Sequence, residues 1–154
     1  MKNNDIKFME IALSLAREAA ELGEIPVGAI IVDKNSNVIA SAYNLRETKK
    51  SATAHAEVLA IEQACSVLGS WRLQGCTLYV TLEPCPMCAG ALVNSRIDRV
   101  VFGAEDMQAG CCGSVVNFKA YPFNHSFEIT GGVLEEECRE VLTEFFYKKR
   151  KERI

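Results

Sequence analysis

Long apolar runs are absent from this sequence of 154 residues. No stretch approaches the roughly 18 consecutive apolar residues that a membrane-spanning helix needs, and we expect no contact with a membrane. Charged residues interrupt the N-terminal segment at Asp5, Glu10, Arg17, Glu18 and Glu21. These charges exclude the apolar core of a signal peptide. We therefore expect a cytoplasmic protein.

Segments rich in proline, glycine or serine are also absent, and no low-complexity run divides the chain. Apolar residues make up 49% of the sequence and charged residues 24%, a balance typical of a folded globular protein. The length suits one hydrophobic core, since single domains commonly have about 100 to 200 residues. We expect residues 1–154 to form a single domain.

An excess of positive charge is lacking, because the formal net charge is −3. Binding of nucleic acid by an overall basic field is therefore excluded. Basic residues are nevertheless concentrated at the C-terminal end, at Lys148, Lys149, Arg150, Lys151 and Arg153. A basic tail of this kind can hold phosphates locally.

The seven cysteines do not suit a disulfide scaffold, because their number is odd and no export signal is seen. We expect reduced thiols, some of them at a metal site. Cys65, Cys76 and Cys138 fall within apolar patterns and are predicted to be small core residues.

Hydrophobic periodicity predicts alternating helices and strands. Apolar residues at helical spacing mark helices over 8–22, 58–68 and 134–146, and Pro84 starts another helix that runs to about Asn94. Short apolar runs beside turn residues mark strands over 27–32, 38–43, 77–82, 99–102 and 127–130. The polar segment 44–52 is predicted to form a loop.

These elements define the expected fold class. The first two strands form an antiparallel hairpin, whereas the strands on either side of helix 84–94 should be parallel because a helix connects them. The prediction is an α/β fold with a mixed five-stranded sheet and helices on both faces.

A Pro-Cys-x-x-Cys motif carries the strongest chemical signal. Cys85 and Cys88 stand three residues apart on a first helical turn, so their sulfurs lie on one face and can bind one ion. The free N–H groups of that turn favour the thiolate. Taken alone, such a motif also fits two structural cysteines or a redox pair.

One of only two histidines stands upstream, in His55-Ala56-Glu57 at the entry to a helix. His-x-Glu followed by Pro-Cys-x-x-Cys is the signature of the zinc-dependent nucleobase deaminases. Three protein ligands, from His55, Cys85 and Cys88, leave the fourth position of Zn²⁺ to water, as at catalytic zinc sites. The alternative is a closed structural site in which Cys111 or Cys112 supplies a fourth sulfur.

Glu57 is predicted to carry protons. Two residues after His55, its carboxylate can reach a zinc-activated water without binding the metal, take the proton of that water and deliver it to the ring nitrogen of a base. The alternative is a solvated first-turn glutamate that merely suits the helix dipole.

The sequence resembles the bacterial tRNA-specific adenosine deaminases over nearly its whole length. The resemblance lies in both zinc motifs and in the segments Glu24–Ala29, Thr81–Cys85, Cys88–Ala91, Arg99–Ala104, Asn124–His125 and Glu135–Phe146. It implies a three-layer α/β/α fold of the cytidine deaminase type, one Zn²⁺ per subunit and a homodimer. The implied substrate is a tRNA anticodon stem-loop, whose wobble adenosine (position 34 of an arginine tRNA) is converted to inosine.

The resemblance also implies a set of substrate contacts. They are Asn44, Ala56, Leu82, Asp106, Asn124 and Phe145. In this set Asn44 would meet the flipped nucleoside, Asp106 the adjoining sugar-phosphate, and Phe145 the path of the loop beside the basic tail. From the residues alone, Asn44 could instead end a strand, Asp106 could cap a turn and Phe145 could be core. The chain has Ser51-Ala52 where family members commonly carry Asp-Pro.

Two other function classes share part of this pattern. A free-base or nucleotide deaminase acting on guanine, cytosine or dCMP would use the same zinc chemistry, with less need for a basic C-terminal helix. A structural zinc or RNA-binding module would need neither Glu57 nor an open coordination position.

Overall fold

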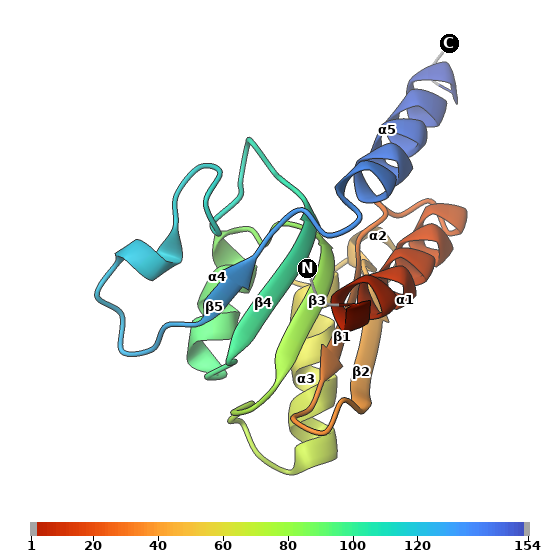
Figure 1. Ribbon diagram of the computed structural model, residues 1–154. Coiled ribbons are helices and arrows are strands. Elements are labelled where there is room, and N and C mark those ends of the chain that lie inside the picture. The colour runs from red at the N-terminus through yellow and green to blue at the C-terminus, as the bar shows by residue number, and fades with distance from the viewer. Residues whose placement is uncertain (1–2, 153–154) are drawn as a thin grey trace.

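A five-stranded sheet between two layers of helices forms the body of the molecule (Figure 1). This computed structural model describes residues 3–152. The helices are α1 (Asn3–Glu21), α2 (Arg46–Lys49), α3 (Ala56–Leu68), α4 (Pro86–Asn94) and α5 (Glu135–Glu152), with a 3-10 turn at Phe118–Ala120. The strands are β1 (Gly28–Val32), β2 (Val38–Tyr43), β3 (Thr77–Leu82), β4 (Arg99–Ala104) and β5 (Glu128–Thr130).

The sheet has the order β2-β1-β3-β4-β5. Strand β1 pairs antiparallel with β2 and β3, whereas β4 pairs parallel with β3 and β5. The predicted mixed five-stranded sheet is therefore confirmed, including the hairpin and the parallel strands on either side of α4.

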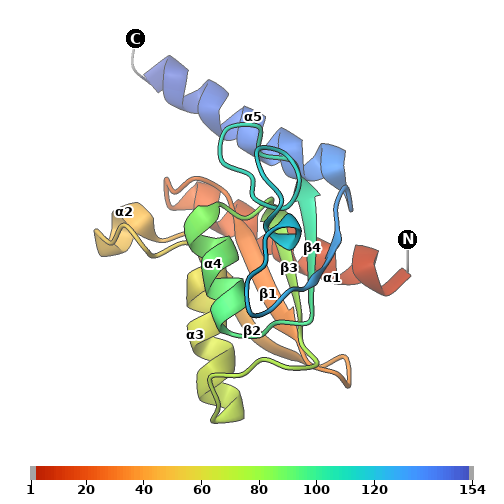
Figure 2. The same cartoon turned by 90° about the vertical axis from the view of Figure 1, so that its left-hand side faces the viewer.

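Both faces of the sheet are apolar and covered. Ile30, Tyr79 and Val101 pack on the side of α1 and α5, while Ile31 and Leu78 pack on the side of α3 and α4. Figure 2 shows these helix pairs on opposite sides of the sheet. Strands buried on both faces read as continuous apolar runs rather than alternating ones, which explains the short apolar segments of the sequence.

The helix ends place the two sequence motifs at one edge of the sheet. Helix α4 starts directly after the carboxyl end of β3, and the N-terminal end of α3 points toward the same edge (Figure 1). At its other end α3 stops at Gly69, which adopts the left-handed conformation with φ 64° that glycine tolerates without a steric penalty. The N-terminal turns of α3 and α4 therefore face one region.

Three predictions differ from the structure. The segment 44–52 is not entirely loop, because it contains the short helix α2, whose amides at Glu47 and Thr48 are bound by the distant Glu24. Cys65 is only partly buried, and its sulfur lies 3.7 Å from the carbonyl oxygen of Trp71. Helix α5 continues past residue 146 to Glu152.

The far half of α5 extends away from the body of the molecule (Figure 1). The helix buries only Cys138 and Phe145, and the basic residues Lys148, Arg150 and Lys151 are exposed. Arg153, the last residue of the predicted basic tail, lies outside the described residues. No helix within residues 3–152 combines the length and apolar character needed to cross a membrane.

Candidate active site

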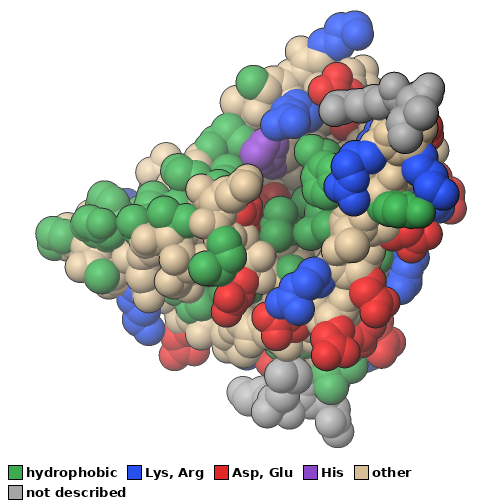
Figure 3. Space-filling view, turned by 90° about the horizontal axis from the view of Figure 1, so that it is seen from above, with side chains coloured by type: hydrophobic (Ala, Val, Ile, Leu, Met, Phe, Trp, Pro, Cys, Tyr) green, Lys and Arg blue, Asp and Glu red, His purple; other side chains and the backbone are tan. Residues whose placement is uncertain are grey.

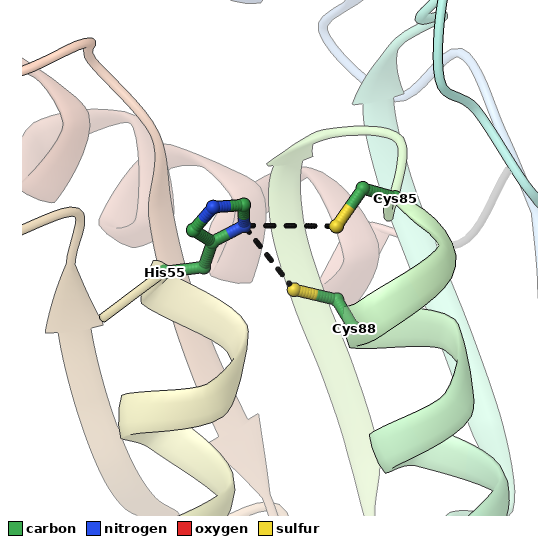
Figure 4. A group of neighbouring side chains, drawn as sticks. All are labelled: His55, Cys85 and Cys88. Carbon is green, nitrogen blue, oxygen red and sulfur yellow. Dashed lines mark hydrogen bonds between the residues drawn. The ribbon is translucent and has the colours of Figure 1, made fainter. Parts of the chain in front are cut away.

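His55, Cys85 and Cys88 converge at the N-terminal ends of two helices, and we call them the ligand trio (Figure 4). His55 is the residue that caps α3, and Cys85 holds the same position on α4. Both have extended backbones, with ψ values of 151° and 175°, which directs their side chains across the helix start. Pro86 begins α4, where its missing N–H costs nothing because that group has no intrahelical partner.

The ligand trio has the dimensions of a zinc site. Nδ1 of His55 lies 3.6 Å from the sulfur of Cys85 and 3.6 Å from that of Cys88. Zn–N bonds near 2.0 Å and Zn–S bonds near 2.3 Å at a tetrahedral angle place the two ligand atoms about 3.6 Å apart. The donor set therefore fits Zn²⁺, with Nδ1 as the histidine ligand.

Cys111 and Cys112 do not complete this cluster. Among the described residues, the only group of three or more ligand atoms close enough to share an ion is the ligand trio. Cys111 directs its sulfur to the carbonyl oxygen of Ala109, at 3.5 Å, and Cys112 is buried. The geometry thus provides three protein ligands, the number typical of a catalytic zinc site.

The cysteine pair favours negative charge. A hydrogen bond from Cys88 lowers the pKa of Cys85 to about 4 despite partial burial, and His55 adds to the effect. The same hydrogen bond, together with burial, raises the pKa of Cys88. Contact with Cys85 raises the pKa of His55. Negative charge is therefore favoured at Cys85, beside the imidazole of His55.

Glu57 lies in the first turn of α3 and is only 4% exposed. Burial raises its pKa to about 7, and the negative charge of Cys85 contributes. The solvated first-turn glutamate considered above is therefore excluded. A carboxyl group with a pKa near neutrality can both accept and release a proton under physiological conditions.

A cavity of about 190 Å³ opens beside the ligand trio, and we call it the central cavity. Its wall includes His55, Glu57 and Cys85. Four of the predicted substrate contacts also line it, namely Asn44, Ala56, Leu82 and Asp106. Seen from above, the surface is hollowed near its middle, and Lys and Arg side chains lie around the hollow (Figure 3).

The other two predicted contacts lie outside the central cavity. Asn124 is exposed in the segment between Phe118–Ala120 and β5. Phe145 is 9% exposed and lines a second cavity of about 480 Å³, the outer cavity. The two cavities share Ile25, Asn44 and Arg46, so they are neighbours. Lys149 lies 5.6 Å above the Phe145 ring.

Polar contacts fix two of the residues in the central cavity. Asn44 donates from Nδ2 to the carbonyl of Ile25 at 3.1 Å and accepts the amide of Arg46 at 3.1 Å. Asp106 accepts the amides of Gln108 and Ala109 at 3.0 and 3.1 Å. Both side chains thus shape the backbone that carries them and still border the cavity.

Several cavity residues were not predicted from the sequence. They are Ile25, Val27, Arg46, Glu83 and Ala109. Glu83 had a visible signal, because it is an acidic residue placed between an apolar strand and the Pro-Cys motif, where a charge needs dedicated partners. Arg46 had none, since it stands in a segment with several other exposed charges.

Fold and site together define a nucleobase deaminase, and comparison with known families agrees. The model of the MafB19-like deaminase family matches residues 3–150. The tRNA-specific adenosine deaminase of Bacillus subtilis (strain 168) is 53% identical over 150 residues, which cover 97% of this chain and 92% of that protein. The chain therefore belongs to the tRNA-specific adenosine deaminases, and it is a hydrolase that acts on carbon–nitrogen bonds.

Solved structures confirm the fold class. A structure from biochemical and structural studies of A-to-I editing by tRNA:A34 deaminases at the wobble position of transfer RNA superposes with a TM-score of 0.85 at 44% identity, over 88% of this chain and 99% of that one. The guanine deaminase from Nitrosomonas europaea superposes with a TM-score of 0.76 at 25% identity, over 91% and 83% of the two chains. The three-layer fold thus serves more than one deaminase substrate.

Proposed function

We propose that this protein hydrolytically deaminates the wobble adenosine, position 34, of an arginine tRNA to inosine. The observation that carries the proposal is the buried Glu57 carboxyl group in the same cavity as the ligand trio. Membership of the tRNA-specific adenosine deaminases supports the choice of substrate. We expect residues 1–154 to act as one domain, in a cytoplasmic homodimer.

His55, Cys85 and Cys88 would hold one Zn²⁺ per subunit. When bound, zinc lowers the pKa of a water molecule toward neutrality and so supplies the nucleophile for C6 of adenine. The residues of the chain must then orient the base, exclude bulk water and move protons.

Glu57 performs the proton transfers. Its pKa of about 7 lets it take a proton from the attacking water and deliver it to N1 of the ring. It next takes the proton of the new hydroxyl group on C6 and passes it to the departing amino group, which leaves as ammonia while the C6 carbonyl of inosine forms. Ala56 and Leu82 supply apolar walls beside the base, and the Asn44 side chain faces the nucleoside.

An anticodon loop suits this cavity better than a duplex does. A base in a loop is already unpaired, so turning it outward costs only a few kcal/mol. The outer cavity, with Arg46, Phe145 and Lys149, continues from the central cavity and can hold the adjoining nucleotides. The exposed Lys148, Arg150 and Lys151 then meet phosphates farther along the loop.

Guanine deamination is the second candidate, favoured by the similarity to the Nitrosomonas europaea enzyme. Incubation with an unmodified arginine tRNA bearing adenosine at the wobble position, with inosine read by sequencing, tests the proposal. Parallel reactions contain free guanine, adenine, cytidine or dCMP. We expect inosine only at the wobble position. Turnover of a free base or nucleotide without conversion of the tRNA would select the second class.

A further inference from the structure

Glu83 is a buried carboxylate at the centre of the segment 105–114, which we call the far loop. The side chain is 2% exposed. Its Oε1 accepts the amide of Asp106 at 3.1 Å and the hydroxyl of Ser114, and its Oε2 accepts the amides of Cys112 and Ser114 at 2.9 and 3.1 Å. Four donors from one loop therefore converge on a single carboxylate.

The far loop is folded around this carboxylate. A Cβ atom at Gly110 would overlap the carboxyl group of Glu83, so the close approach of backbone to side chain requires glycine. The same loop brings Asp106 and Ala109 to the central cavity. The position of that wall thus depends on Glu83.

Glu24 plays the same part for the segment 44–50, which we call the near loop. It is 1% exposed. Its Oε1 accepts the amide of Glu47 at 3.1 Å and its Oε2 the amide of Thr48 at 2.6 Å. Burial would raise the pKa of Glu24, but hydrogen bonds from the Thr48 side chain and from the amides of Thr48 and Glu47, together with the charge of Arg46, outweigh burial and lower it.

Apart from Glu24, polar contacts hold the start of the near loop: the amide of Asn44 donates to Val27, its side chain to Ile25, and the amide of Leu45 to Ala54. Helix α2 has no buried residues, so apolar packing does not fix its position. The loop carries Asn44 and Arg46, which border both the central and the outer cavity. Its place beside the substrate path is therefore set by polar anchors.

We propose that Glu24 and Glu83 are a pair of positioning residues, one for each loop that borders the substrate cavities. Each carboxylate holds one loop by hydrogen bonds to its backbone amides, and neither touches the reacting atoms. The inference rests on the proposed function for its effect on substrate, whereas the anchoring itself stands on the contacts above.

Isosteric substitutions separate anchoring from packing. In Glu83→Gln one carboxylate oxygen becomes an NH₂ group, which then faces either the amides of Cys112 and Ser114 or the amide of Asp106 beside the Ser114 hydroxyl. In Glu24→Gln the NH₂ group faces one backbone amide. A donor placed against a donor leaves buried groups unsatisfied while side-chain volume is kept. Glu105→Gln and Glu21→Gln remove the same charge from exposed positions and serve as matched controls.

Hydrogen exchange of the zinc-loaded protein is the first measurement. We expect Glu83→Gln to speed exchange by at least tenfold at one or more of the amides of Asp106, Cys112 and Ser114, without changing exchange at Glu47 and Thr48. Glu24→Gln should give the reverse pattern. Exchange in β1 and β3 should stay as in the wild type. Faster exchange throughout the chain in both variants would overturn the proposal. Exchange in the anchored loop that is no faster than in the wild type would overturn it as well.

Deamination of an anticodon stem-loop RNA with adenosine at the wobble position is the second measurement. We expect both variants to lose at least tenfold in kcat/KM, mostly through KM, because Glu57 and the ligand trio lie on α3 and α4 rather than on the loops. Zinc content should be unchanged. Loop-specific exchange with kcat/KM equal to that of the controls would overturn the positioning role.

Milder variants keep the test decisive where Glu83→Gln or Glu24→Gln fails to fold. Ser114→Ala removes only the hydroxyl that binds Glu83, and Thr48→Val only the hydroxyl that binds Glu24. Each should give a smaller effect in its own loop, and the absence of that effect would overturn the proposal.

If the wild type leaves the RNA unchanged, the proposed function fails, and the exchange pattern alone still decides whether the loops are anchored.

Discussion

Glu57 and Glu83 lie in the wall of one cavity, and both carboxyl groups are almost completely shielded from solvent. Their surroundings differ. Glu83 accepts hydrogen bonds from three backbone amides and a hydroxyl of the far loop. Glu57 instead lies among the sulfurs and the imidazole of the ligand trio, and burial raises its pKa to about 7.

Burial alone therefore does not identify a proton carrier. A carboxylate surrounded by backbone donors is held in place by groups that neither take nor give protons at neutral pH, which suits a structural task. A carboxyl group with few fixed donors and a pKa near neutrality can exchange protons with a substrate. Its position beside the ligand trio is the reason we propose a chemical role for Glu57.

The largest expected effect comes from Cys88→Ser, which removes one of the three proposed zinc ligands. Zinc content should fall to a small fraction of one per chain, and activity and thermal stability should fall together, because metal binding and folding are coupled. Elemental analysis and thermal unfolding check this. X-ray absorption of the wild type should give two sulfurs, one nitrogen and one light oxygen. A shell of three or four sulfurs would contradict the open site.

Glu57→Gln should separate proton transfer from metal binding. We expect the variant to keep zinc and fold but to lose at least about 100-fold in kcat, since general acid–base catalysis contributes roughly 10² to 10⁴. Glu62→Gln, an exposed change on the same helix, is the control. Turnover within a few-fold of the wild type would show that Glu57 is not the proton carrier. The proposed contrast in role between Glu57 and Glu83 would then fail.

Stability as a function of pH gives a smaller effect with a defined sign. The pKa of Glu57 rises from 4.5 to about 7 on folding, so the folded state binds more protons between these values. This contribution to stability is complete below pH 4.5 and is lost as pH rises through about 7.

Urea unfolding of the zinc-depleted protein measures this contribution. The wild type should lose up to about 3 kcal/mol relative to Glu57→Gln between pH 4 and pH 8, because groups that titrate in both proteins cancel. A constant difference across the range would show that folding does not change the pKa of Glu57.

Local patterns in the sequence account for what could be predicted. Apolar patterns predicted all five strands and three of the helices, Pro84 predicted a fourth helix, and the two motifs with His55, Cys85 and Cys88 predicted the ligand trio. These signals depend on residues close together in sequence, or on side chains whose chemistry has few alternatives.

Contacts between distant residues account for what was missed. Glu24 binds amides 23 and 24 residues away, and Glu83 binds groups between 23 and 31 residues away. Hydrophobic periodicity does not reveal contacts between residues so far apart in the sequence. The sequence therefore predicts a loop where the structure has helix α2. The only sign of a special role for Glu83 in the sequence is a charge at the end of an apolar strand. Likewise, only the fold places Phe145 in the outer cavity and Asn124 away from both.

The smallest expected effect concerns the surface beyond both glutamates. Truncation after Tyr147 removes the exposed Lys148, Arg150 and Lys151 but leaves the buried residues of α5 in place. We expect tRNA to bind several-fold more weakly, with a flatter salt dependence, because each lost phosphate contact removes about 0.7 to 0.9 from the slope of log K against log salt. Zinc content and turnover at saturating tRNA should not change.

Lys148 is 3.2 Å from Glu144, so part of its charge is already paired and the loss should stay below one contact per basic residue. A full-length chain with Lys148, Lys149, Arg150, Lys151 and Arg153 all changed to glutamine separates charge from helix length, and it should match the truncated protein. An unaltered affinity and slope in both proteins would leave the basic helix end without a role in binding and would favour a free-base substrate.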